Sequence, residues 1–262
     1  MRAAVSLPTT FRNRRLRKWR EFQQWIDQHS DSRWIFRGLG DPKFTLLPSV
    51  GRKTPYRLMQ ERAIFSIFEK RASEFSDTTS WEPLDFLSVA QHHGLPTRLL
   101  DWTTNPLVAA YFAVISEPAP TNVRPLTASG RVSRREITAT PSRANADARV
   151  IAYPVLASMV FQPKDDPFAV AGVGVIAPRS LTARIVTQSG VFTVHGDPSR
   201  PWTAPLANPA NVFDIPASMR EFFRRRLYFL GIEPQRIMGG LDGLGSRLAW
   251  QYREAIGLGA LK

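Results

Sequence analysis

The sequence predicts an α+β fold in which mixed helices accompany a mainly antiparallel sheet. Apolar residues recur at helical spacing in some segments and form short strand-like runs in others. The two kinds of segment do not alternate as βαβ units, which argues against a parallel sheet. The chain has 262 residues, of which 43% are hydrophobic, enough for one sizeable domain with appendages.

The first helix is expected over residues 13–28. Its apolar residues share one face and its basic residues occupy the other. The apolar positions are Leu16, Trp19, Phe22, Trp25 and Ile26. We therefore assign residues 1–30 to a basic amphipathic helix and residues 31–262 to the main domain.

A buried strand is expected at Trp34–Phe36, followed by two helices. The first helix is predicted over residues 56–75, with an inner face formed by Leu58, Ile64, Phe68, Ala72 and Phe75. The second covers residues 83–93 and ends at Gly94, a residue suited to a helix C-cap. A third helix begins at Asn105-Pro106, because asparagine is a good N-cap and proline fits the first helical position.

Residues 118–147 change in composition to Pro, Ser, Thr, Ala and Arg. This segment has no apolar face to offset its ordering entropy, so a flexible insertion is expected. Strand-like runs then follow at residues 149–155, 172–176, 183–186 and 191–194. Ser218 and Glu221 form a capping-box pattern that opens a helix ending near Gly231, and residues 246–256 predict a last helix.

The charge balance favours an anionic partner. The net charge is +13, with basic clusters near both ends of the chain. Such an excess predicts nucleic-acid contact, although an arginine-rich proteome explains it equally well. No cysteine is present, which excludes disulfides and thiolate metal sites. No apolar run approaches a membrane span and no signal-peptide core is visible, so a cytoplasmic protein without membrane contact is expected.

The run from Gln91 to Thr103 is the most informative stretch of the sequence. It places two histidines, an arginine and an aspartate in thirteen residues, QHHGLPTRLLDWT. Unpaired buried polar groups cost free energy, so such a cluster is either fully hydrogen-bonded or functional. A second polar stretch lies upstream at Phe36-Arg37-Gly38 and continues to Arg52.

These two stretches together resemble the FRG domain, a family named for the triplet found here at Phe36-Arg37-Gly38. The resemblance covers about residues 34–113, with weaker similarity at 188–193 and a partial departure at 238–243. It implies a setting in toxin or phage-defence systems, with an antitoxin or another defence protein as a possible partner.

By analogy the pattern also resembles arginine–serine–glutamate ADP-ribosyltransferases, which use NAD. Their first motif, a strand that ends in Arg-Gly, is matched by Arg37-Gly38. Their second motif is matched by a Thr-rich strand followed by a Val-Ala-x-x-Phe-Ala helix. The analogy implies catalytic roles for Arg37, His93, Asp101 and Gln188. It implies NAD contacts by Arg37, Gly38, Thr97, Arg98, Trp102, Thr103 and Tyr111.

Arginine suits the pyrophosphate because it offers bidentate donors. Gln188 falls where the third motif has a carboxylate, and glutamine supplies no charge. Asp101 is the residue expected to supply the carboxylate in place of Gln188. No metal is expected, and adjacent His92 and His93 are poorly placed to share one.

Two other functions remain open. A metal-independent nuclease would use His92 or His93 with Arg37, Arg98 and Asp101. A non-catalytic module would bind a ligand or partner. The polar residues also have structural interpretations: Arg37 as a buried ion pair with Asp101, Thr97-Arg98 as a turn network and Gln188 as part of a turn. We expect Arg37, His93, Thr97, Arg98, Asp101 and Thr103 to meet at one pocket.

Overall fold

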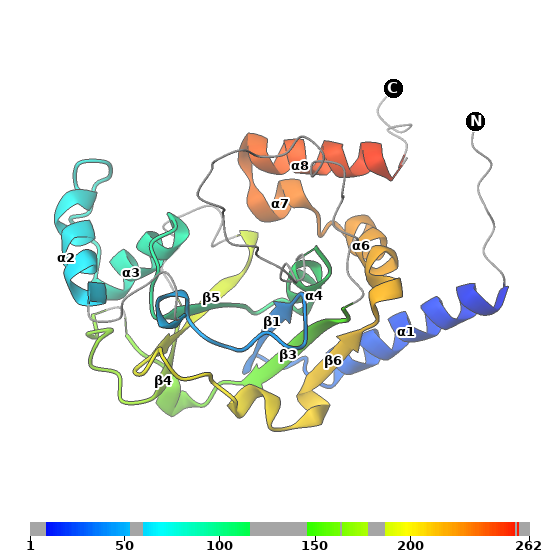
Figure 1. Ribbon diagram of the computed structural model, residues 1–262, viewed down its shortest axis with the longest axis horizontal. Helices are drawn as coiled ribbons and strands as arrows, with labels where there is room; N and C mark the ends of the chain where they lie inside the picture. The colour runs from blue at the N-terminus through cyan, green and yellow to red at the C-terminus, as the bar shows by residue number, and fades with distance from the viewer. Residues whose placement is uncertain are drawn as a thin grey trace, which may run out of the picture.

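The protein is built on one six-stranded antiparallel sheet with helices packed against it (Figure 1). The computed structural model describes residues 9–52, 60–115, 146–162, 164–177, 187–254 and 256. The strand order is β4-β5-β2-β1-β3-β6, and each neighbouring pair is antiparallel. The strands are β1 Trp34–Leu39, β2 Leu99–Thr103, β3 Ala148–Pro154, β4 Val173–Ile176, β5 Gly190–His195 and β6 Val212–Ile215.

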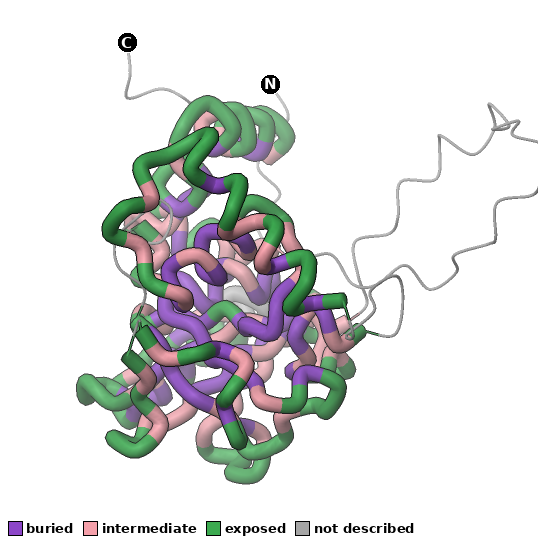
Figure 2. Tube along the Cα trace, turned by 90° about the vertical axis from the view of Figure 1, so that its left-hand side faces the viewer, coloured by how far each residue is buried: buried purple, intermediate pink, exposed green. Residues whose placement is uncertain are grey.

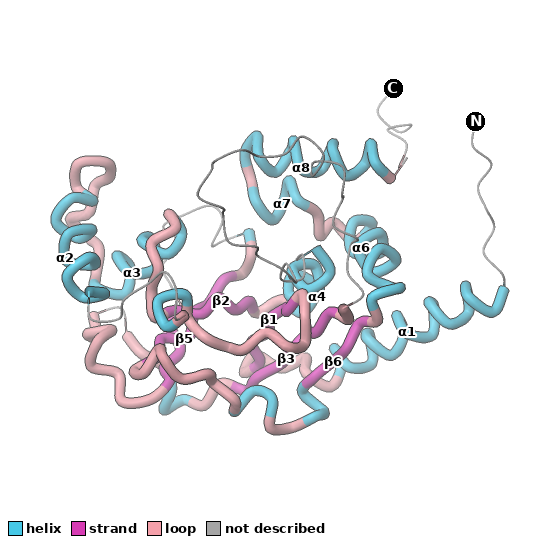
Figure 3. The backbone as a smooth tube through the Cα atoms, in the orientation of Figure 1, coloured by secondary structure: helices cyan, strands magenta, loops and turns pink. Residues whose placement is uncertain are grey.

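Figure 3 shows the helices in cyan beside the magenta strands of the sheet. Short 3-10 turns, such as Ser49–Gly51 and Ala217–Met219, join the main elements. The α-helices are α1 Thr9–Asp27, α2 Glu61–Ala72, α3 Pro83–His92, α4 Pro106–Ile115, α6 Arg220–Phe229, α7 Pro234–Met238 and α8 Gly240–Arg253.

Two separate groups of helices bury apolar side chains against the sheet. Helices α1, α4, α6 and α7 pack over β1, β3 and β6 in a core that includes Phe22, Phe36 and Phe223. Helices α2 and α3 pack over β2, β4 and β5 in a second core that includes Phe65 and Phe192. Each half of the sheet therefore has its own helical cover.

A third apolar cluster is covered by loops instead of long helices. It combines strand residues such as Ile35 and Ile151 with Leu46, Trp202 and Leu206 from connecting segments. In Figure 2 the buried stretches gather in the middle of the molecule and the exposed ones at its periphery. The central strands are thus enclosed by packed side chains.

The sheet has a weak join between β1 and β2. Strand β1 pairs with β3 through six residues, and β2 pairs with β5 through five. Between β1 and β2 the register is a single pair, Phe36 with Thr103. The join between the two halves of the sheet coincides with the boundary between their helical covers, and we call it the seam.

Close packing of α4 on β1 explains the glycine of the Phe-Arg-Gly triplet. A Cβ on Gly38 would lie 2.0 Å from the carbonyl oxygen of Ala109 and 2.6 Å from the amide nitrogen of Ala113. No side chain fits between these backbones. The start of α4 follows the sequence prediction, because the Asn105 side chain accepts a hydrogen bond from the Leu107 amide at 2.9 Å.

Several predicted details are wrong. In α2, Ile64 is 44% exposed and Phe65 is the buried aromatic residue, while Phe75 lies beyond the end of the helix and is 82% exposed. Helix α6 starts without a Ser218 capping box: its N-cap is Met219, which makes no side-chain cap. The last helix begins at Gly240 instead of residue 246, and β6 and α7 were not expected. The insertion at 118–147, except its last two residues, and the strand at 183–186 lie outside the described residues.

Candidate functional site

A cavity of about 390 Å³ opens at the seam. Strands β1, β2 and β5 form part of its wall, α3 and α4 contribute from the two helical groups, and the residues before β5 complete it. This volume is within the range of small-ligand pockets. The lining residues are Phe36, Arg37, Gly38, Gln91, His92, Asp101, Trp102, Thr103, Ala109, Phe112, Gln188, Gly190 and Phe192.

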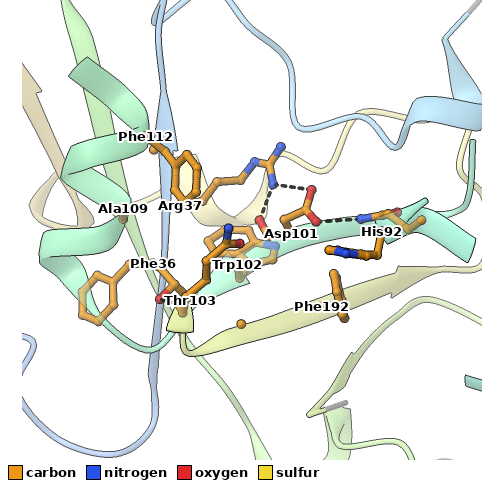
Figure 4. Close-up of a pocket in the computed structure, with 13 residues that line it drawn as sticks. Phe36, Arg37, His92, Asp101, Trp102, Thr103, Ala109, Phe112 and Phe192 are labelled. Atoms are coloured by element: carbon orange, nitrogen blue, oxygen red, sulfur yellow. Dashed lines mark hydrogen bonds and ion pairs between the residues drawn. The ribbon is translucent and has the colours of Figure 1, made fainter. Parts of the chain in front are cut away.

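Arg37 connects β1 and β2 next to their single residue pair, where the backbone pairing does not continue (Figure 4). Its Nη1 donates to the backbone carbonyl of Asp101 and lies 3.9 Å from that residue's carboxylate. The side chain is 18% exposed, and its buried Nε has no hydrogen-bond partner among the described residues. Burial lowers the pKa of the guanidinium, Asp101 raises it and Arg52 lowers it further. Arginine nevertheless stays charged, so the cavity contains a cation with a spare donor.

Asp101 is held in place but remains open to solvent. Its side chain is 70% exposed, and the Gln91 amide donates to its carboxylate at 2.8 Å. The Gln91 carbonyl in turn accepts a hydrogen bond from the Thr97 hydroxyl, and the Thr97 amide donates to the Ser49 hydroxyl at 3.1 Å. This chain of hydrogen bonds fixes the carboxylate beside Arg37 without burying it.

Aromatic residues from three strands and a helix line the cavity, although the Phe36 ring points away from Arg37 into the core (Figure 4): Phe36, Trp102, Phe112 and Phe192. The Trp102 ring is fixed from behind, because its Nε1 donates to the Thr193 hydroxyl at 3.1 Å. That hydroxyl lies 2.9 Å from Nε2 of His195. The hydroxyl has one proton and a second lone pair, so it can pair with the imidazole in either tautomer.

His195 is a buried residue to which sequence analysis assigned no role. Burial, followed by the charges of Arg37 and Arg98, lowers its pKa to about 4. The ring is therefore neutral at neutral pH. The alternating pattern of β5 places His195 on the same face as Thr193, but it does not reveal that Trp102 of β2 bonds the same hydroxyl.

Thr103 and Gln188 join the cavity to the C-terminal helices. The Thr103 hydroxyl donates to the Gln188 carbonyl at 2.6 Å and accepts from the Asn105 amide at 3.0 Å. The Gln188 side-chain amide donates to the Ile237 carbonyl of α7 at 3.1 Å. Gln188 thus lines the cavity while its amide group is hydrogen-bonded to α7.

We expected six polar residues to meet at one cavity, and three of them do not line it. Arg98 is buried away from the cavity, where its Nη2 pairs with Glu61 at 2.6 Å. His93 is exposed at the end of α3, and the cavity is lined by its neighbour His92. Thr97 does not line the cavity but supports it through Gln91. Arg37, Asp101 and Thr103 do come together there.

Tyr111 also lies apart from this cavity. It lines a second one, between α4, α6, α7 and α8, together with Arg224 and Tyr252. Burial raises the pKa of the Tyr111 hydroxyl to about 12. The structural interpretation of Arg37 as part of a buried ion pair is also wrong in one respect, because its partner Asp101 is exposed.

The described ranges contain no group of three or more histidine, aspartate or glutamate residues arranged to hold a metal ion. Within the same ranges, no helix has both the length and the apolar character needed to span a membrane.

Comparison with known proteins gives one match, to the FRG domain over residues 32–122. No curated protein and no solved structure matches the chain. The matched segment runs through β1, α2, α3, β2 and α4, and it supplies Arg37, Gln91, His92 and Asp101 of the cavity. The triplet at Phe36-Arg37-Gly38, the cavity and the match all coincide in one segment, and the chain therefore contains an FRG domain.

Proposed function

We propose that the seam cavity binds NAD and that the protein is an ADP-ribosyltransferase-like enzyme of a toxin or phage-defence system. The observation that carries this proposal is the pairing of Arg37 with Asp101 inside an aromatic-lined cavity. A fixed cation with a spare Nε donor suits a pyrophosphate, and an exposed carboxylate beside it suits the positive charge of a ribosyl transition state.

Each group has a role in the proposed reaction. Arg37 holds a phosphate oxygen, and Trp102 or Phe112 packs against the nicotinamide ring. The bond between ribose C1′ and the nicotinamide nitrogen breaks, and its electron pair leaves with neutral nicotinamide. Asp101 stabilises the cationic ribose until an acceptor oxygen or nitrogen attacks C1′ and loses its proton. The net charge of +13 favours nucleic acid over protein as the acceptor.

The Asp101→Asn variant tests this function. The unmodified protein is incubated with NAD labelled in the nicotinamide ring, with and without total RNA, and nicotinamide release is measured. We expect release by the unmodified protein and a loss of at least tenfold in the variant, because asparagine keeps the shape but not the charge. Asp31→Asn, which alters an exposed aspartate paired with Arg33, is the control and should release nicotinamide normally.

Other outcomes point to the other functions. RNA cleavage without NAD would replace the proposal with a nuclease, for which His92 in the cavity is the available base. NAD binding without release would indicate a binding module. Release that is unchanged in Asp101→Asn would remove the carboxylate from the mechanism.

A further inference from the structure

The fold brings basic residues from opposite ends of the chain onto one surface. Helices α1 and α6 pack together through Trp19 and Phe223, whose ring centroids are 5.1 Å apart. Trp19 stands between Lys18 and Arg20 in the sequence, Phe223 is followed by three arginines, and the N-terminal end of α1 extends away from the body in Figure 1. Arg224 turns to Trp250 and the second cavity. We call the remaining basic surface of the two helices the basic ridge; it comprises Arg14, Arg15, Arg17, Lys18, Arg20, Arg225 and Arg226.

Two guanidinium groups of the ridge share one aromatic ring. Arg15 of α1 lies 6.0 Å from the centroid of Phe222, and Arg226 of α6 lies 5.5 Å from it. Both positive charges are therefore concentrated around a half-buried phenylalanine. Like charges gathered around one ring repel each other, and a polyanion bound across them relieves that repulsion.

Carboxylates neutralise only part of the ridge. Glu21 pairs with Arg17 and Lys18 at 3.7 and 3.3 Å. Arg225 pairs with Glu221 and Glu254 at 3.5 and 3.1 Å. In the described part of the chain, no carboxylate lies within ion-pairing distance of three exposed arginines of the ridge, Arg14, Arg20 and Arg226.

The burial of the α1 aromatic residues argues against a membrane or a single-stranded nucleic acid as the partner of the basic ridge. An amphipathic helix binds a membrane through an exposed apolar face, but Trp19, Phe22 and Trp25 are buried in the core. For the same reason these rings are unavailable for stacking on the bases of a single strand. What remains exposed is a row of cations. Residues 14 to 20 span about 9 Å of helix rise, or two to three backbone steps of a duplex.

We infer that the basic ridge binds the phosphate backbone of double-stranded nucleic acid without sequence preference. The inference rests on the proposed function and names the class of nucleic acid that would be the acceptor. The ridge lies on α1 and α6, which contribute nothing to the seam cavity. Its test contains no NAD, so failure here and failure of NAD cleavage are separate results.

The test measures fluorescence anisotropy of a labelled 20-base-pair duplex of mixed sequence between 50 and 200 mM salt. The ridge variant carries Arg14→Gln, Arg20→Gln and Arg226→Gln. The control carries Lys43→Gln, Lys70→Gln and Arg200→Gln, which removes the same charge from exposed positions elsewhere. Thermal denaturation verifies that both are folded.

We expect the ridge variant to bind at least tenfold more weakly than the control. The slope of log affinity against log salt concentration should be smaller in magnitude by about two to three, since each phosphate contact contributes about 0.9 to that slope. Equal losses in the two variants would overturn the inference, because net charge alone would then explain binding. Absence of duplex binding, or tighter binding to single strands or to anionic vesicles, would overturn it as well.

Discussion

Replacing Arg37 with alanine separates its structural role from its proposed role in binding. The substitution removes the hydrogen bond to the Asp101 carbonyl and an ion pair at 3.9 Å. Losing one hydrogen bond and leaving a carbonyl unsatisfied costs about 1–3 kcal/mol of folding free energy. The ion pair adds about 1 kcal/mol at most, because Asp101 is 70% exposed and water screens its charge. The variant should therefore remain folded with a lowered melting temperature.

The loss of ligand binding is a second quantity, separate from this loss of stability. A charge-assisted hydrogen bond to a phosphate is worth roughly 1.5–3 kcal/mol, or ten- to hundredfold in the dissociation constant for NAD. Arg37→Lys should restore little of it, because an ammonium cannot make the planar two-point contact. Calorimetric titration with NAD and thermal denaturation of the same samples give both quantities.

The control for this experiment is Arg33→Ala, which removes an exposed arginine paired with Asp31. It should change neither NAD affinity nor stability appreciably. The reasoning is refuted if Arg37→Ala stays folded and binds NAD as tightly as the unmodified protein. It is also refuted if Arg37→Lys restores full affinity.

Three further predictions concern the framework of the site. Gly38→Ala should destabilise the fold by several kcal/mol in chemical denaturation, because the added Cβ would meet the Ala109 carbonyl at 2.0 Å. The control, Gly172→Ala, has open space around it and should have little effect. Glu61→Ala should cost about 3–5 kcal/mol of folding free energy by leaving Arg98 buried without its ion-pair partner. Glu74→Ala, which breaks an exposed pair, should have a much smaller effect, and similar losses in the two variants would contradict this reasoning. The pKa of His195 is lowered from 6.5 to about 4, so its stabilising contribution is complete above pH 6.5 and is lost as the pH falls toward 4, by about 3 kcal/mol in all. His195→Gln should flatten this part of the pH–stability curve, and an unchanged slope would show that another group titrates there.

Local signals in the sequence predicted the elements nearest the cavity. Asn105-Pro106 and Gly94 mark helix ends through their own backbone preferences, and the structure confirms both. Gly94 has a φ of 88°, which glycine adopts without strain. Strand β6 was missed because Asp214 interrupts its four residues, whereas β4, equally short, has no charged residue. So short a run gives no clear period.

The site was less predictable because its partners are distant in sequence. Arg98 and Asp101 are three residues apart, yet Arg98 turns to Glu61, 37 residues away. Nothing in the local pattern identifies that partner. The choice between His92 and His93 depends on where α3 ends relative to the cavity, and helix ends are difficult to predict within one residue. Phe36-Arg37-Gly38 could be assigned to the site because a motif, rather than periodicity, marked it.

The matched segment, residues 32–122, occupies the middle of the sheet and not one side of it. It contains β1 and β2, but β3 and β5, the long-ladder partners of these strands, come later in the chain. Cut out alone, it would expose the unpaired backbone of both strands, the kind of edge that promotes aggregation. It would also lack Gln188, Gly190 and Phe192 from the cavity wall. The boundaries of the sequence match are therefore not those of an autonomous folding unit, and a usable expression fragment must extend at least through β6.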